Sequence, residues 1–239
     1  MMKQMEATAV LEELESLATP YTKKRYISNG AKEPLFGVPT GKMKPMSKEI
    51  VMDQELAEEL YATDNFDAMY FAGIIAEPNG MSIEDYNRWM DDAYFFMLAD
   101  SVVSVTLSES DIAEEVADEW IKSGKDLHMS AGWSTYCWLL GSRKDEEFSM
   151  DKLSEMLEYV KNNIQDMPPH AKDAMTNFVY TVGTSYVPLH EEALAIAKAI
   201  GEVEIERENK KSKIINAYEN IQTQVEKDRI GFKRKYVRC

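Results

Sequence analysis

One carboxylate stands inside an apolar segment of the chain. Asp100 lies between Phe95-Phe-Met-Leu98 and Val102-Val103. An ionised carboxylate is rarely buried without a partner, so Asp100 must either meet hydrogen-bond donors or face a site. Two interpretations follow: Asp100 is a structural acid bonded to nearby backbone or to a serine such as Ser130 or Ser134, or it belongs to a catalytic site.

Aromatic rings form a second candidate group. Trp133 and Tyr136 lie three residues apart in an apolar stretch, and Phe178 lies in a later one. Rings on a concave surface can contact bases or sugars. The same rings can instead fill a hydrophobic core, and both interpretations are kept.

Residue types that bind metals are scarce. The chain has two cysteines, Cys137 and Cys239, and three scattered histidines, His128, His170 and His190. These residues do not show the spacing of zinc ligands, and no Gly-rich phosphate loop occurs. We therefore expect neither a metal nor a cofactor. Two cysteines are also too few for a disulfide framework, which favours a reducing cytoplasm as the location.

Positive charge is concentrated in two short segments on either side of a strongly acidic body. Residues 20–50 hold seven Lys/Arg against two Glu, and residues 210–239 hold nine against three acids. Residues 51–209 hold ten Lys/Arg against 33 acids, and the whole chain has a net charge of −15. Two basic segments could present a stripe to phosphates. Alternatively, the basic tail docks on the acidic body of the same chain.

The length of 239 residues suits one large domain or two small ones. A content of 44% hydrophobic and 29% charged residues is ordinary for a globular protein. The sequence has no apolar run of 18 residues, and its first residues lack the apolar stretch of a signal peptide. We expect neither a membrane span nor a membrane partner.

Helix signals recur along the chain, while strand signals are almost absent. Ser149 is a capping serine ahead of an apolar helical face, and Ser82 with Asp85 has the pattern of a capping box. Pro188 and Gly201 bracket another amphipathic segment, as expected for the first helical position and for the position just past the end of a helix. The sequence therefore predicts an all-α protein.

Segments that are apolar nearly all round alternate with these amphipathic helices. They start near residues 64, 95, 126 and 168, at spacings of about 31, 31 and 42 residues. Helix pairs with this period are typical of α-solenoids of the HEAT or armadillo type, and the alternative is an irregular helical bundle. We predict a single repeat domain over 1–239: capping helices at 1–62, about four helix pairs at 64–201, and a C-terminal helix and basic tail at 202–239. Residues 202–209, with four Glu, are expected to form a solvated loop.

Several motifs resemble a known family. Residues 26–38 (YISNGAKEPLFGV) and 42–50 (KMKPMSKEI) are similar to the N-terminal motif of the DNA alkylation repair proteins, which are built from HEAT-like repeats. Residues 98–103 (LADSVV), 178–188 and the tail 231–239 (GFKRKYVRC) resemble a branch of the same family. The resemblance covers essentially the whole chain. It implies a curved DNA-binding scaffold, whose active members excise N3- or N7-alkylated purines from DNA.

The chain departs from the catalytic pattern that this resemblance implies. Active members carry a Trp-Asp-x-x-Asp segment, an Arg on the next repeat and a further Trp. Asp100 retains the first Asp, whereas Val103 replaces the second and Ala99 replaces the Trp. The following repeat has no Arg before Arg143, and Phe178 stands where the late Trp is expected. An isopropyl group cannot supply the electrostatic stabilisation of a carboxylate, so we expect glycosylase activity to be absent or rearranged.

Three hypotheses follow. The first is a cytoplasmic DNA-binding protein of this family that lacks the usual catalytic set and binds duplex DNA, including damaged or distorted duplexes. The second is an active alkylpurine glycosylase with a rearranged site of Asp100, Trp133, Tyr136 and Phe178. The third is a protein-interaction scaffold, which the acidic body favours. Under the first hypothesis, the two basic segments converge on one side and the phosphates are held by Lys42, Lys44, Lys48, Lys233, Arg234, Lys235 and Arg238.

Overall fold

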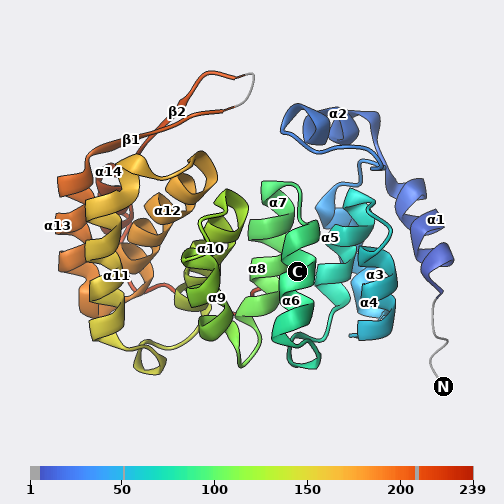
Figure 1. Ribbon diagram of the computed structural model, residues 1–239, viewed down its shortest axis with the longest axis horizontal. Coiled ribbons are helices and arrows are strands. Elements are labelled where there is room, and N and C mark those ends of the chain that lie inside the picture. Colours follow the sequence, from blue (N-terminus) through green and yellow to red (C-terminus); the bar gives the residue numbers. More distant parts are fainter. Residues whose placement is uncertain (1–5, 51, 208–209, 239) are drawn as a thin grey trace. The chain divides into compact units, whose positions relative to one another are not determined.

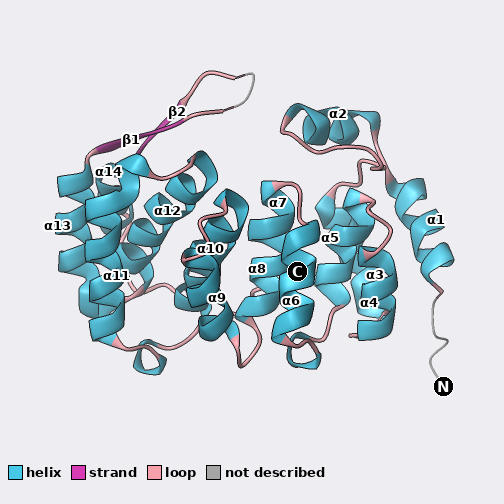
Figure 2. Ribbon diagram, viewed as in Figure 1, coloured by secondary structure: helices cyan, strands magenta, loops and turns pink. Residues whose placement is uncertain are grey.

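The computed structural model describes residues 6–50, 52–207 and 210–238 (Figure 1). The chain forms two compact units, one of Met1–Asp111 with Arg238–Cys239 and one of Ile112–Val237. Helices make up nearly all the regular structure described in both units, and a two-stranded sheet belongs to the second (Figure 2). The all-α class is therefore confirmed, whereas the single repeat domain over 1–239 stays a prediction.

The first unit is a succession of short helices around the apolar helix α5. Asn65 caps α5 by accepting the backbone N–H groups of Asp67 and Ala68. A Cβ at Gly73 would lie 2.5 Å from Cγ1 of Val102, so glycine permits the close approach of the next helical segment. The helices are α1 (Ala7–Leu17), α2 (Pro20–Ser28), α3 (Thr40–Glu49), α4 (Gln54–Tyr61), α5 (Phe66–Ile75), α6 (Ile83–Asp92), α7 (Phe96–Leu98), the π-helical turn η2 (Ala99–Val103) and α8 (Ser104–Ser108).

The second unit is centred on two long helices, α10 and α12, that pack along each other. Helix α9 packs on α10, and α13 and α14 pack on α12. A Cβ at Gly132 would lie 2.7 Å from the carbonyl oxygen of Ala117, so glycine lets α9 and α10 approach closely. The helices are α9 (Ala113–Ile121), α10 (Asp126–Ser142), α11 (Met150–Asn163), α12 (Pro169–Ser185), α13 (His190–Ile200) and α14 (Ala217–Glu226).

Several local predictions are confirmed. The Ser82 hydroxyl accepts the N–H of Asp85 and the Asp85 carboxylate accepts the N–H of Ser82, which completes the capping box of α6. Ser149 caps α11, and Gly201 ends α13 with a φ of +70°. These agreements show that side chains near helix ends carry local information that can be recognised without the tertiary structure.

The expectation of a solvated loop at 202–209 is wrong for residues 202–205, whereas 206 and 207 are exposed loop residues and 208–209 lie outside the described residues. Glu202–Ile205 forms strand β1, which pairs antiparallel with strand β2 at Lys213–Asn216. Val203 and Ile205 are buried, whereas the glutamates that alternate with them are exposed. A strand of only four residues with two acidic positions gives a weak period-two signal, which is why the sequence did not reveal it.

No helix in the described ranges is both long and apolar enough to span a membrane.

Candidate nucleic-acid interface

A buried carboxylate holds the Phe36-Gly-Val38 motif in place. The Asp67 side chain accepts the backbone N–H groups of Phe36 at 2.7 Å, Gly37 at 2.8 Å and Val38 at 2.8 Å. Burial raises the pKa of Asp67, although the three N–H donors favour its charged form. Gly37 has a φ of +95°, and a Cβ there would lie 2.5 Å from Cβ of Lys23, so the motif requires glycine. The motif thus fixes the chain between α2 and α3 to α5.

Helix α2 presents a basic face to solvent. Its inner side is fixed by Tyr26, which is 1% exposed and donates its hydroxyl to the carbonyl of Val38 at 2.9 Å. The opposite side carries residues at positions i, i+3, i+4 and i+7, which lie on one face of a helix. All four are exposed, with Tyr21 at 77%, and we call them the α2 face: Tyr21, Lys24, Arg25 and Ser28.

Helix α3 divides its three lysines between two sides. Lys44 and Lys48 lie one helical turn apart, both exposed, and we call them the α3 pair. Lys42 lies ~200° around the helix from Lys44. Its Nζ is 3.5 Å from the carbonyl oxygen of Leu17, at the end of α1. Of the lysines expected on this helix, the structure therefore places two together and one apart.

The tail of the second unit uses Lys233 for an internal contact. The Nζ of Lys233 lies 2.7 Å from Asp145 and donates to the carbonyl of Leu140 at 2.7 Å. Both charged side chains are 23% exposed. Lys233 is therefore tied to its own unit by an ion pair and a backbone acceptor.

Arg234 and Lys235, which follow Lys233, are more exposed to solvent. The backbone N–H of Arg234 donates to the carbonyl of Gly141 at 2.7 Å, and the guanidinium lies 4.7 Å from the ring centroid of Trp138. Arg234 and Lys235 are both exposed residues. The tail therefore has two cations exposed to solvent next to Lys233, which is paired within its unit.

Arg238, which belongs to the first unit, is also engaged. Its guanidinium pairs with Glu109 and donates to the carbonyls of Gly73, Ile74 and Ala76, and the side chain is 12% exposed. The last carbonyls of a helix have no N–H donor within that helix, so Arg238 satisfies the end of α5. For Lys233 and Arg238, docking on the same chain is the interpretation that the contacts support.

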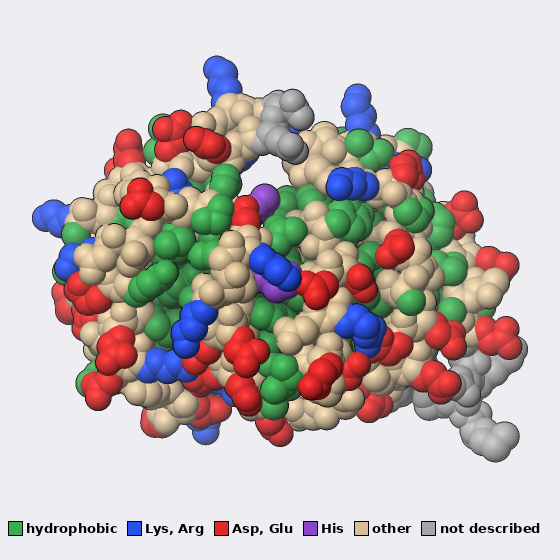
Figure 3. All heavy atoms as spheres, in the orientation of Figure 1, with side chains coloured by type: hydrophobic (Ala, Val, Ile, Leu, Met, Phe, Trp, Pro, Cys, Tyr) green, Lys and Arg blue, Asp and Glu red, His purple; other side chains and the backbone are tan. Residues whose placement is uncertain are grey.

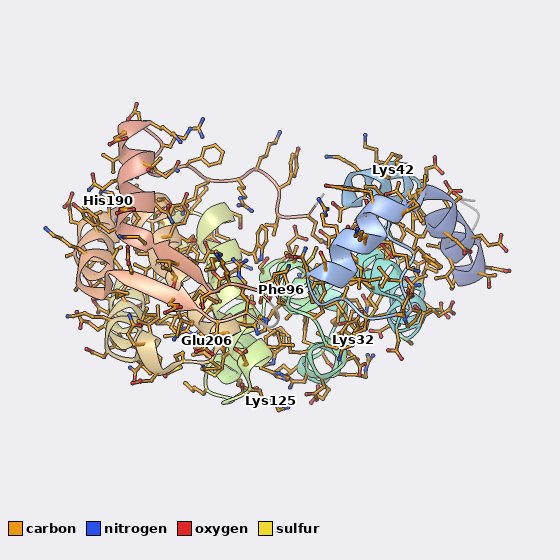
Figure 4. The ribbon with its side chains drawn as sticks, turned by 90° about the horizontal axis from the view of Figure 1, so that it is seen from above. Lys32, Lys42, Phe96, Lys125, His190 and Glu206 are labelled. Carbon is orange, nitrogen blue, oxygen red and sulfur yellow. The ribbon has the colours of Figure 1, made fainter. Side chains whose placement is uncertain are left out.

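The connection between β1 and β2 carries further cations that were not among the predicted site residues. Arg207, Lys210 and Lys211 lie between β1 and β2 and are exposed. Figure 4 labels Glu206 at the end of β1, where the hairpin leaves the helices of its unit. These residues were missed because the preceding strand was interpreted as part of an acidic loop. On the face shown in Figure 3, acidic side chains are scattered over the surface, and Lys and Arg lie among them.

Asp100 lies half-buried in the π-helical turn η2, and the Ser104 hydroxyl donates to the carbonyl of Ala99 at 2.8 Å. Ala99 and Val103 are both 0% exposed. The positions that would carry the Trp and second Asp are therefore occupied by small apolar side chains in the core. A catalytic role for Asp100 stays a hypothesis.

The structure brings Trp133, Tyr136 and Phe178 together, but inside the second unit. They are 1%, 0% and 0% exposed, and the Phe178 ring centroid lies 5.0 Å from Trp133 and 6.2 Å from Tyr136. Burial raises the pKa of Tyr136, whose hydroxyl donates to Asp118 at 2.6 Å. Of the two interpretations, these contacts support the hydrophobic core: α10 and α12 pack along each other, and the three rings lie between them.

Among the residues that the structure describes, no three His, Cys, Asp or Glu side chains gather in a way that could hold a metal ion.

The model of a family described as DNA alkylation repair enzyme matches residues 10–221. The chain belongs to this family. Two Listeria relatives are similar to it: the uncharacterized protein Lin0241 of Listeria innocua is 28% identical over 81% of this chain and 85% of its own, and Lmo0209 of Listeria monocytogenes is 27% identical over 88% and 93%.

One solved structure is much more similar. It is 62% identical, covers 98% of this chain and 100% of its own, and superposes with a TM-score of 0.96. It is described as a new family of proteins related to the HEAT-like repeat DNA glycosylases, with affinity for branched DNA structures. The DNA alkylation repair family and its HEAT-like repeat fold are thus established for this chain, as its motifs predicted.

Proposed function

We propose that this protein binds branched DNA and does not excise alkylated bases. The observation that carries the proposal is the 62% identity and TM-score of 0.96 to a protein described as having affinity for branched DNA. Identity at this level over 98% of the chain supports the expectation of the same kind of partner. Branched DNA is a more specific ligand than the duplex DNA that the family resemblance implied.

Phosphates are the chemical group that the exposed cations fit best. The α2 face supplies Lys24 and Arg25 with no acidic residue in the helix, and the α3 pair supplies two more cations. Within the second unit, the hairpin cations and the exposed Arg234 and Lys235 play the same role in this proposal. Lys233 and Arg238 are assigned to intrachain contacts rather than to phosphates, and Lys42, which is exposed on the other side of α3, stays a candidate for a separate phosphate contact.

The absence of base excision rests on the turn around Asp100. Ala99 and Val103 are buried, so neither an aromatic face nor a second carboxylate is offered at those positions. A preorganised group aimed at developing charge contributes about 3 kcal/mol, or a hundredfold or more in rate. With several such groups replaced, the expected release of N7-methylguanine is near background, although such losses are not additive.

One assay set tests both parts. Binding is measured for a four-way junction, a three-way junction and a blunt duplex of matched length across a salt series, and base release is measured on N-methylpurine DNA. We expect the junctions to bind more tightly than the duplex, with affinity falling steeply as salt rises. Equal affinity for junction and duplex, or an affinity independent of salt, would contradict the binding proposal.

Robust base release by the unmodified protein would contradict the second part and support a rearranged glycosylase site. Asp100→Asn then decides the role of Asp100, because it removes the charge with little change in volume. Loss of turnover in a folded variant would make Asp100 catalytic, whereas loss of folding would make it a structural acid.

We also propose a cytoplasmic location. Two cysteines are too few for a disulfide framework, which is the usual composition of a protein kept in a reducing compartment. Fractionation of the source cells with antibody detection tests this, and recovery outside the cytoplasm would overturn it.

A further inference from the structure

Two of the most exposed aromatic rings of the described chain lie in its tail. Phe232 is 67% exposed and Tyr236 is 71% exposed. Aromatic side chains of this size usually bury most of their area, because the apolar surface contributes strongly to packing. Large apolar side chains exposed within one short segment are candidates for a binding surface.

The backbone on both sides of Phe232 is held by its own unit. The N–H of Gly231 donates to the carbonyl of Thr184 at 2.8 Å, and the N–H of Arg234 donates to that of Gly141 at 2.7 Å. Between them, Lys233 is fixed by its ion pair with Asp145. Phe232 therefore projects from a segment with defined attachments, and Tyr236 lies two residues beyond the last of them.

The charge beside the rings is positive. Residues 231–238 contain no acidic residue, and Arg234 and Lys235 are exposed. The Lys235 Nζ lies 5.2 Å from the ring centroid of Tyr236, so a cation and a π-face are presented together. Aromatic rings next to cations are the combination by which proteins bind single-stranded nucleic acid: the rings stack on bases, and the cations contact phosphates.

We propose that Phe232 and Tyr236 stack on unpaired nucleotides of branched DNA, with Arg234 and Lys235 on the adjoining phosphates. This inference rests on the proposed function and adds to it a preference for branches with an unpaired arm. In a duplex every base face is covered by its neighbours, so exposed rings gain no stacking there. An unpaired arm offers open base faces, and stacking on them is tolerant of sequence.

The test compares Phe232→Leu/Tyr236→Leu with the unmodified full chain. Leucine keeps apolar area at both positions and removes the π-face. The DNA probes are a splayed-arm junction with an unpaired arm that carries 2-aminopurine, a fully paired four-way junction and a blunt duplex. Tyr159→Leu is the control variant, because Tyr159 is 42% exposed on α11, outside the tail.

We expect the double variant to bind the splayed arm about tenfold or more weakly, in keeping with the loss per stacked base. Its affinity for the blunt duplex should be unchanged, and the 2-aminopurine quenching given by the unmodified protein should disappear. The Tyr159→Leu control should keep both the affinity and the quenching.

Three results would overturn the inference. Unchanged binding of the splayed arm by the folded double variant would remove the rings from the interface, while the proposed function stands if junction binding remains. An equal loss on all three probes would assign the rings a role that does not depend on unpaired bases. Failure of the unmodified protein to bind any probe would overturn the proposed function together with this inference.

Discussion

The α2 face and the tail are both basic in sequence, but the structure uses their cations differently. Lys24 and Arg25 project into solvent from a regular helix. In the tail, Lys233 is paired with Asp145, and the terminal Arg238 is paired with Glu109. Some basic residues of the sequence are therefore paired within the chain and are not available to a partner.

The difference has a physical origin in backbone hydrogen bonding. A helix satisfies its interior N–H and C=O groups by itself, so the cations of α2 are available for other partners. An irregular tail must bond to the body, and its side chains take part in that attachment. Lys233 and Arg238 both donate to main-chain carbonyls as well as to carboxylates.

Among the variants considered, removal of the exposed cations on α2 and α3 should have the largest effect on DNA affinity. We expect Lys24→Gln/Arg25→Gln/Lys44→Gln/Lys48→Gln to weaken junction binding about a hundredfold or more. The slope of log affinity against log salt should flatten by roughly 0.9 for each phosphate that the variant no longer neutralises. The measurement is binding by fluorescence anisotropy over a salt series.

A matched control changes Lys161 and Lys198 to Gln, because these exposed lysines lie on α11 and α13. The control removes two charges and the quadruple variant removes four. If both weaken binding equally for each charge removed, the effect reflects overall charge, and the α2 face and the α3 pair have no special role.

Arg238→Gln tests a cation that is paired within the chain. The variant leaves Glu109 and three main-chain carbonyls without the guanidinium, and we expect the stability of the first unit to fall by about 2 kcal/mol. Thermal unfolding and limited proteolysis measure it. A variant that unfolds like the unmodified protein but binds DNA more weakly would place Arg238 on phosphates instead.

Asp67→Asn tests the clamp that connects α2 to the body. An amide can present only one acceptor oxygen to the three N–H donors of Phe36, Gly37 and Val38, so we expect the free energy of unfolding to fall by about 2 kcal/mol. Denaturant unfolding measures the change, and Glu59→Gln is the control, because Glu59 is an exposed acid on α4. An equal decrease in both variants would mean that net charge, rather than the clamp, sets the effect.

Lys233→Gln should have the smallest effect on stability, about 1 kcal/mol, because the ion pair with Asp145 is partly exposed to solvent. Once measured at a temperature where both proteins are folded, its DNA affinity should match that of the unmodified chain. A tenfold weaker affinity with unchanged unfolding would reassign Lys233 to the interface.

The fold was largely predictable because its signals are local. The apolar segments starting near residues 126 and 168 correspond to α10 and α12, whose bounds are Asp126–Ser142 and Pro169–Ser185. Caps such as Ser149 act within one helical turn. The hairpin was not predicted because each strand has only four residues and is stabilised by pairing with the other strand, not by a pattern within its own sequence.

The candidate site was less predictable because it depends on contacts between distant residues. By itself, the sequence determined the repeat spacing, the family and the replacement of the second carboxylate by Val103. Only the tertiary structure decided that Trp133 and Phe178 lie in the core and that Lys233 meets Asp145. Periodicity and capping are properties of neighbouring residues, whereas burial and ion pairing follow from how helices far apart in the chain pack together.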